Sequence, residues 1–291
     1  MSIVFHLLGG LCALSLTPTA QRPTPRAGRS VLIREPAATY HAKSKDFLSS
    51  HQLADFRKCP LLYYRKKHGL ITDDDRPAYL VGRAAHTLIL EGQDRFDQEY
   101  AVGGPINPKT GQPYGPTTKA FAEWAQTIGK EILTDSQYEL VTNMHLSVIQ
   151  HEVAHTLLAD GVAERVVRSE YCGMPCQIRV DWYDPFFGIV DLKTCDDLTW
   201  FESDARRFGY VYQLAFYRAV LAEVMGITFP VHLIAVEKKE PYRSGVWKIS
   251  NESLGLAQKT NEAAIAQLRD CLATNIWPTG YEQPRIFDCV A

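Results

Sequence analysis

The stretch EYCGMPCQIRVDWYDPFFGIVDLKT, residues 170–194, carries the strongest signals of secondary structure and chemistry in the chain. Residues 177–183 alternate apolar and polar side chains, and this period of two is typical of a half-buried strand. The Asp184-Pro185 pair predicts a turn. The apolar run 187–192 predicts a short buried strand. We therefore expect a hairpin of two core strands.

This hairpin would bring two carboxylates and one amine together. Asp181 lies on the first strand and Asp191 near the end of the second. Side chains alternate along a strand, so Asp191 and Lys193 share one face and Leu192 points to the other. Burying unpaired charge is costly, and a bound cation is a common compensation. An exposed hairpin with a weak ion pair is the alternative, but the apolar run favours a core strand.

Two carboxylates near one point suit Mg²⁺, which takes oxygen ligands and keeps several waters for a substrate phosphate. A lysine beside such an ion can orient or deprotonate an attacking water, while the ion stabilises charge on the phosphate oxygens. The residues alone thus indicate metal-assisted phosphoryl chemistry.

Asp181, nine intervening residues and Asp191-Leu-Lys193-Thr194 resemble the PD-(D/E)xK nuclease signature. More narrowly, they resemble the exonuclease VIII (RecE) and RecB-nuclease branch, to which lambda exonuclease is a more distant relative. Gly82-Arg-Ala-Ala-His86 is similar to the G-x-x-x-H element of the branch, and Gln213-Leu-Ala-Phe-Tyr217 is similar to its Q-x-x-x-Y motif. The order and spacing of these motifs carry the resemblance, which spans roughly residues 44–249.

The resemblance implies an α/β fold with a restriction-endonuclease-like core, in which helices flank a central mixed sheet. It implies a metal shell of four groups: His86, Asp181, Asp191 and the Leu192 backbone carbonyl. Related nucleases often carry another acidic residue on the preceding strand, expected at 163–171. This points to Glu170, which would bind a second metal or the attacking water.

The same resemblance implies that Mg²⁺ is the cofactor, with Mn²⁺ able to substitute. Asp181 and Asp191 would be catalytic through the metal, and Lys193 would position and activate the water. Gln213 would form a hydrogen bond near the metal, and Tyr217 would contact a phosphate. From the residues alone, His86 could equally be an ordinary core histidine, and the Gln213–Tyr217 pair could be buried polar packing.

The implied activity is a metal-dependent DNA exonuclease that hydrolyses phosphodiester bonds on double-stranded DNA ends in recombination. The resemblance further implies degradation from 5′ ends, a ring-shaped homo-oligomer and a single-strand-annealing partner. Two alternatives stay open. One is another nuclease of this core, such as an endonuclease or a RecB-like module. The other is a catalytically inactive DNA-binding protein of the same fold.

A rival motif lies upstream, where His151-Glu-Val-Ala-His155 matches the H-E-x-x-H pattern of zinc proteases. It fixes only three positions and needs a third ligand further downstream. We expect these histidines on the solvated face of a helix spanning 135–158. The nuclease signature is longer, and we prefer it to a metalloprotease.

Composition fits a protein of this kind. At 291 residues, with 46% hydrophobic and 22% charged residues, the chain can form one good core. Its net charge of −2 argues against general, charge-driven coating of nucleic acid and favours a local groove. Seven irregularly spaced cysteines, with no C-x-x-C pair, predict reduced thiols in a cytoplasmic protein without a membrane association.

We expect two parts in the chain: a disordered leader and linker over 1–40 and a nuclease domain over 41–291. The apolar run 3–16 could be a signal peptide, but no basic residue precedes it and it is short for a membrane span. Residues 21–39 are rich in Pro and Arg, which is typical of a linker. Ser49 or Ser50 is expected to cap the first helix of the domain.

Further elements follow from periodicity and turn residues. We expect a loop at 103–116, strands at 227–238 and 245–249, and helices at 78–90, 117–133, 135–158, 199–208, 210–225 and 254–272.

Overall fold

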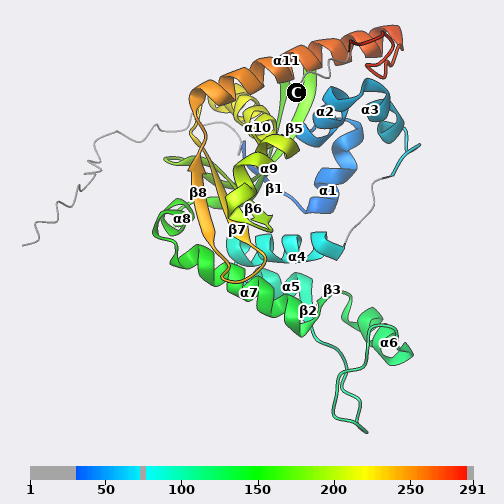
Figure 1. The fold of residues 1–291 in the computed structure, drawn as a ribbon, viewed down its shortest axis with the longest axis vertical. Helices are drawn as coiled ribbons and strands as arrows, with labels where there is room; N and C mark the ends of the chain where they lie inside the picture. Colours follow the sequence, from blue (N-terminus) through cyan, green and yellow to red (C-terminus); the bar gives the residue numbers. More distant parts are fainter. Residues whose placement is uncertain (1–30, 73–76, 287–291) are drawn as a thin grey trace, which may run out of the picture.

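The computed structural model describes residues 31–72 and 77–286, and a six-stranded mixed sheet forms its centre (Figure 1). The strand order is β1-β4-β5-β6-β7-β8, and within this sheet only the β6–β7 pair is parallel. This is the restriction-endonuclease-like mixed sheet that the sequence analysis predicted. The strands are β1 Ile33–Arg34, β4 Val162–Tyr171, β5 Met174–Asp184, β6 Gly188–Cys195, β7 Val231–Glu237 and β8 Ser244–Lys248.

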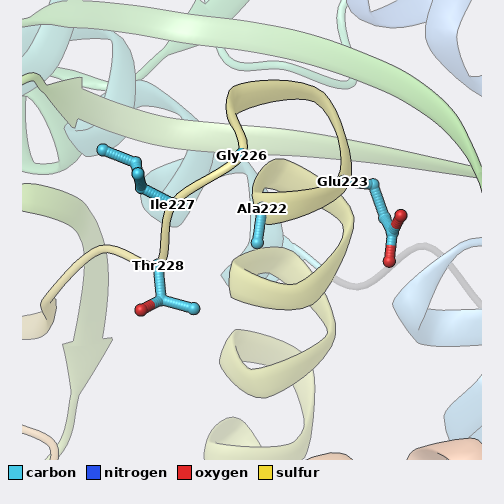
Figure 2. A pocket seen from close by; sticks show the side chains of 5 residues that line it. All are labelled: Ala222, Glu223, Gly226, Ile227 and Thr228. Atoms are coloured by element: carbon cyan, nitrogen blue, oxygen red, sulfur yellow. The ribbon is translucent and has the colours of Figure 1, made fainter.

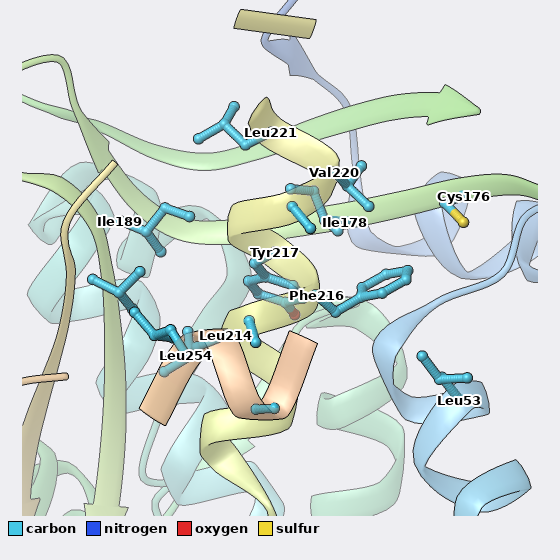
Figure 3. Packing of buried hydrophobic residues seen from close by; sticks show 14 of the residues in the cluster. Leu53, Cys176, Ile178, Ile189, Leu214, Phe216, Tyr217, Val220, Leu221 and Leu254 are labelled. Atoms are coloured by element: carbon cyan, nitrogen blue, oxygen red, sulfur yellow. The ribbon is translucent and has the colours of Figure 1, made fainter. Parts of the chain in front are cut away.

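Helices cover both faces of the sheet and enclose two hydrophobic cores. The first core packs under α2 Ser50–Lys58, α10 Tyr210–Met225 and α11 Asn251–Thr274. Figure 3 shows Leu214, Phe216 and Val220 of α10 close to Ile178 of β5. The second core packs under α4 Pro77–His86 and α7 Asp135–Gln150 on the other face. The remaining helical segments are α1 Ala37–Ala42, η1 Lys43–Lys45, α3 Pro60–Lys67, η2 Thr87–Glu91, α5 Gln93–Glu99, α6 Lys119–Ile128, α8 Glu152–Leu157, η3 Leu198–Trp200 and α9 Phe201–Phe208.

Two tight turns shape the β4–β5–β6 meander. Cys172 and Gly173 connect β4 to β5 with φ angles of 51° and 71°, the signs that a two-residue hairpin turn of the favoured twist requires. The expected Asp184 turn joins β5 to β6, where the Asp184 carboxylate accepts the backbone N–H groups of Phe186 and Phe187 at 2.6 and 2.7 Å. The predicted hairpin is therefore formed.

The expected start of the first domain helix is also confirmed. Ser49 caps α2 in a capping box, because its hydroxyl accepts the Gln52 backbone N–H and the Gln52 side chain accepts the Ser49 N–H. Residues 60–67, which are rich in basic and aromatic side chains, form the next helix, α3. Tyr63 is buried there, and Trp277 from the tail packs against Tyr63 and Tyr64.

Three expected helices differ in the structure. The one expected over 117–133 ends at Gly129, whose left-handed conformation terminates α6, and β3 Glu131–Leu133 then pairs with β2 Tyr100–Val102. The one expected over 135–158 breaks at His151, which adopts an extended conformation. The one expected over 78–90 changes after His86 into the π-helical stretch η2, a feature frequent at functional sites.

The predicted boundary at residue 40 is wrong for residues 33–40. β1 pairs with β4, and the Glu35 carboxylate forms an ion pair with Arg168. Tyr40 in α1 is buried. This segment therefore belongs to the folded domain, whereas residues 1–30 of the leader and linker predicted over 1–40 lie outside the described residues. None of the helices within 31–72 and 77–286 combines the length and apolar character needed to cross a membrane.

Candidate active site

The candidate site lies where β5 and β6 separate. The two strands pair only near their turn, with Asp184 opposite Gly188 and Trp182 opposite Val190. Beyond these pairs the Leu192 N–H donates to the Asp181 carboxylate at 2.9 Å rather than to a strand partner. The separation thus turns a backbone donor toward one of the two predicted acids.

A third acid, Glu164, comes from β4. The β4–β5 ladder places Ala163 opposite Trp182 and Arg165 opposite Val180, so Glu164 lies level with Asp181. Glu164 has a φ of 54°, which is unusual for a residue with a side chain. Such local departures from strand geometry redirect side chains and cluster at functional sites.

His86 completes a possible metal-binding group. Potential ligand atoms of His86, Glu164 and Asp181 all lie within 4.8 Å of one another. His86 Nδ1 is 3.6 Å from Asp181 Oδ2. Burial, followed by the nearby Lys193 ammonium, lowers the pKa of His86 to about 4. The imidazole is therefore neutral at physiological pH, as a metal ligand must be.

The second predicted acid, Asp191, is held from two sides. Its carboxylate forms an ion pair with Lys193, as the shared strand face predicted. On the other side the Gln213 amide lies 3.5 Å from Asp191 Oδ1 and 3.1 Å from the Tyr217 hydroxyl. Gln213 and Tyr217 stand one turn apart on α10, so the structure brings both predicted motif residues to Asp191.

Crowding of these acids makes their joint ionisation unfavourable. Burial, reinforced by the Asp181 charge, raises the pKa of Glu164 to about 8. Burial likewise raises the pKa of Asp181, and it raises that of Asp191 to about 6 although Lys193 opposes this. A divalent cation among the carboxylates would offset this cost, and the donor set of carboxylate oxygens with one neutral imidazole fits such an ion.

Lys193 is an ammonium group in this environment. Burial lowers its pKa, but the charges of Asp191 and Asp181 outweigh burial and leave the pKa raised. The Tyr210 ring lies beside it, with the ring centroid 4.9 Å from Lys193 Nζ. Tyr210 was not predicted as a site residue, although it stands one helical turn before Gln213.

The acidic ligand expected at Glu170 is not brought into the group. Glu170 is exposed and pairs with Pro175 beside the Cys172–Gly173 turn, at the opposite end of β4. Glu164 occupies the position level with Asp181 instead. A signal for this existed, because a two-residue turn at 172–173 fixes the register that aligns 164 with 181.

The rival zinc-protease motif lacks the geometry it needs. His151 is not on the helix that carries His155, since it caps α8 and its Nδ1 accepts the Ala154 N–H at 3.3 Å. Among the residues that the structure describes, the cluster able to hold a metal is the His86 group instead.

A shallow hollow of about 720 Å³ lies elsewhere, at the end of α10 away from Gln213 (Figure 2). It is lined by Ala222, Glu223, Gly226, Ile227 and Thr228. Glu223 alone among these is ionisable, so the hollow offers no convergent chemistry and is unrelated to the acids.

Comparison with known proteins agrees with this geometry. The profile of the family described as "PDDEXK-like domain of unknown function (DUF3799)" matches residues 49–287. A crystal structure of a "putative exonuclease" from Eubacterium rectale has a TM-score of 0.64 and 16% sequence identity, and the match covers 89% of this chain and 96% of that one. At this identity the likeness shows the fold. No curated protein matches the sequence. The family match covers most of the chain and includes every residue of the candidate site, and the chain belongs to this PDDEXK-like family within the PD-(D/E)xK nuclease superfamily.

Proposed function

We propose that the protein is a divalent-metal-dependent deoxyribonuclease that hydrolyses phosphodiester bonds. The single observation that carries the proposal is a cluster of buried or half-buried acids: Glu164 and Asp181 lie together with His86, and Asp191, whose pKa the Asp181 charge helps to raise, pairs with the Lys193 ammonium. Lys193 pairs with Asp191 and Arg179 with Glu164, so three acids face two cations and one negative charge is left in surplus. Surplus charge that is half-buried or buried destabilises a fold unless a bound ion offsets it.

Five groups would hold the ion. They are the carboxylates of Glu164, Asp181 and Asp191, the His86 imidazole and the Leu192 backbone carbonyl. The Leu192 backbone already forms a hydrogen bond with His86, which places it beside the cluster. A bound Mg²⁺, or Mn²⁺ in its place, lowers the pKa of water and neutralises developing charge on phosphate oxygens.

Lys193 would place the attacking water in line with phosphorus and stabilise the negative charge that develops there. Its ion pair with Asp191 holds the ammonium at this carboxylate, which supports the assignment. Gln213 would keep the Asp191 carboxylate in position, and the Tyr217 hydroxyl would contact a phosphate or hold the Gln213 amide.

For the substrate, we propose the ends of double-stranded DNA, which makes the enzyme an exonuclease of the exonuclease VIII (RecE) kind. The support is the resemblance of three motifs, in order, to that branch. A role in recombination, a single-strand-annealing partner, a homo-oligomer and a cytoplasmic location belong to the same proposal. An endonuclease or RecB-like module with this site is the second candidate.

The test compares linear and covalently closed circular duplex DNA, incubated with Mg²⁺ or with EDTA. We expect loss of the linear DNA only, and only with Mg²⁺. Asp191→Ala should abolish the activity. Asp196→Ala is the matched control, because Asp196 lies just beyond the same strand and its side chain is 86% exposed.

Cleavage of the closed circle would replace the exonuclease proposal with an endonuclease. Retention of full activity by Asp191→Ala would remove the site assignment. Metal-independent DNA binding without any cleavage would favour a catalytically inactive DNA-binding protein of this fold.

A further inference from the structure

An exposed aromatic ring stands at the edge of the candidate active site. Phe208 is the last residue of α9, and 58% of its surface is exposed to solvent. Gly209 follows in a left-handed conformation and turns the chain into α10. A phenylalanine exposed to this extent gains little from packing, and such a ring beside a site points to a contact with a ligand.

Phe208 connects to the catalytic lysine through one other ring. The rings of Phe208 and Tyr210 are stacked at an interplanar angle of 27°, with centroids 5.9 Å apart. The Tyr210 centroid is in turn 4.9 Å from Lys193 Nζ. Behind Tyr210 lies the buried ring of Phe201, at 6.3 Å. The Phe208 ring is therefore supported by the packed rings of Tyr210 and Phe201, which fix its position relative to Lys193.

The Arg207 guanidinium already lies over the Phe208 ring. The Arg207 guanidinium carbon lies 4.5 Å from the Phe208 ring centroid. Arg207 also donates to Asp204 at 2.9 Å, but its side chain is 69% exposed, so displacing it from the ring costs little. Nucleobases stack on aromatic rings and on guanidinium planes alike.

We propose that Phe208 is a stacking platform for an unpaired nucleobase of the DNA strand whose phosphate lies at Lys193. This rests on the proposed function and deepens it. With 4.9 Å from Lys193 Nζ to the Tyr210 ring and 5.9 Å from there to the Phe208 ring, Phe208 lies at most about three base steps of 3.4 Å from Lys193. A base inside a duplex has both faces covered by its neighbours, so the platform favours an unpaired base near the end over a base inside the duplex.

A fluorescent base tests this directly. Duplex DNA with a four-nucleotide single-stranded end carries 2-aminopurine at one of the four unpaired positions. Binding is measured with Ca²⁺ in place of Mg²⁺, and a gel confirms that the DNA stays intact. The wild-type protein is expected to quench the fluorescence at one position. Phe208→Ala should lose the quenching and raise Kd about five- to a hundredfold.

Two further variants separate stacking from simple apolar contact. Phe208→Trp should keep the quenching, and Phe208→Leu should lose it as Phe208→Ala does. Tyr281→Ala is the matched control, because Tyr281 is 72% exposed and lies under the Arg285 guanidinium at 4.1 Å, yet it belongs to the C-terminal tail. This control should bind and quench as the wild type does.

The inference is overturned if Phe208→Ala quenches as the wild type does, or if Phe208→Leu keeps the quenching. Either result leaves the proposed function intact, provided that wild-type cleavage of DNA with Mg²⁺ continues. Absence of wild-type cleavage on every DNA substrate overturns the proposed function instead, and the quenching assay still reports on Phe208.

Discussion

Replacement of Glu164 by glutamine should stabilise the metal-free protein at alkaline pH. In the folded chain the Glu164 carboxyl has a pKa of about 8, against an ordinary value of 4.5, because it is buried beside Asp181. Its ion pair with Arg179, at 2.5 Å, is too weak to reverse this. Glutamine keeps the size and hydrogen-bonding capacity of the side chain and removes the charge.

The sign and size follow from linkage between proton binding and folding. Below pH 4.5 the Glu164 carboxyl is protonated in both the folded and the unfolded state. It then adds no pH dependence to the unfolding free energy of the wild type relative to Glu164→Gln. As pH rises toward 8, the unfolded chain gives up a proton that the folded protein retains, and wild-type stability falls. Above pH 8 the loss is complete, with an upper limit of about 5 kcal/mol for a shift of this size.

The assay is urea-induced unfolding of both proteins in EDTA at pH 5 and pH 8.5. The gain in unfolding free energy of Glu164→Gln over wild type should be larger at pH 8.5 by about 2–5 kcal/mol. With Mg²⁺ the difference between the two proteins should narrow, since the wild type gains about 2.7 kcal/mol at a metal concentration of 100 Kd. The variant, lacking one ligand, should gain less.

Either of two results would show that Glu164 does not act in this way. One is a Glu164→Gln variant that is equally or less stable than wild type at pH 8.5 in EDTA. The other is an undiminished gain of stability from Mg²⁺ in that variant. Glu170→Gln is the control, because Glu170 is exposed on the same strand, and it should change neither quantity.

Three other changes give distinct outcomes. Lys193→Ala should lower kcat for DNA cleavage by about 10²–10³, because it removes charge stabilisation at the phosphate, and unchanged circular dichroism will confirm that the fold is intact. Tyr217→Phe removes the hydroxyl that accepts from Gln213 at 3.1 Å and should slow cleavage about tenfold; an unchanged rate would remove the role given to that bond. Gly188→Ala should lower the unfolding free energy by about 3 kcal/mol or more, since Gly188 has a φ of 79° and an added Cβ would lie 2.2 Å from the Pro230 carbonyl oxygen. Urea unfolding that shows less than about 1 kcal/mol would contradict this reading of the β5–β6 turn.

Local patterns predicted the elements around the acids well. The alternation over 177–183, the Asp184 turn and the apolar run after it specify β5 and β6 without outside information. The helical spacing of Gln213 and Tyr217 likewise placed them on one face of α10. These features depend only on residues close together in the chain, so periodicity and turn residues are enough to predict them.

Features that depend on tertiary contacts were missed. Glu164 reaches Asp181 only through the register of the β4–β5 hairpin, and its positive φ has no local sequence signal. Residues 33–40 look like a linker because Pro and Arg are frequent nearby, yet Arg168, far along the chain, binds Glu35. The break at His151 interrupts a continuous helical pattern for which hydrophobic periodicity gives no warning.

The measurement that tests the metal centre most directly is anomalous X-ray diffraction from crystals of the protein soaked in Mn²⁺. We predict an anomalous peak bounded by His86, Glu164, Asp181 and Asp191, and loss of that peak in Asp181→Asn crystals. An anomalous map with no peak between these side chains, from crystals whose protein still cleaves DNA in Mn²⁺, would contradict the account.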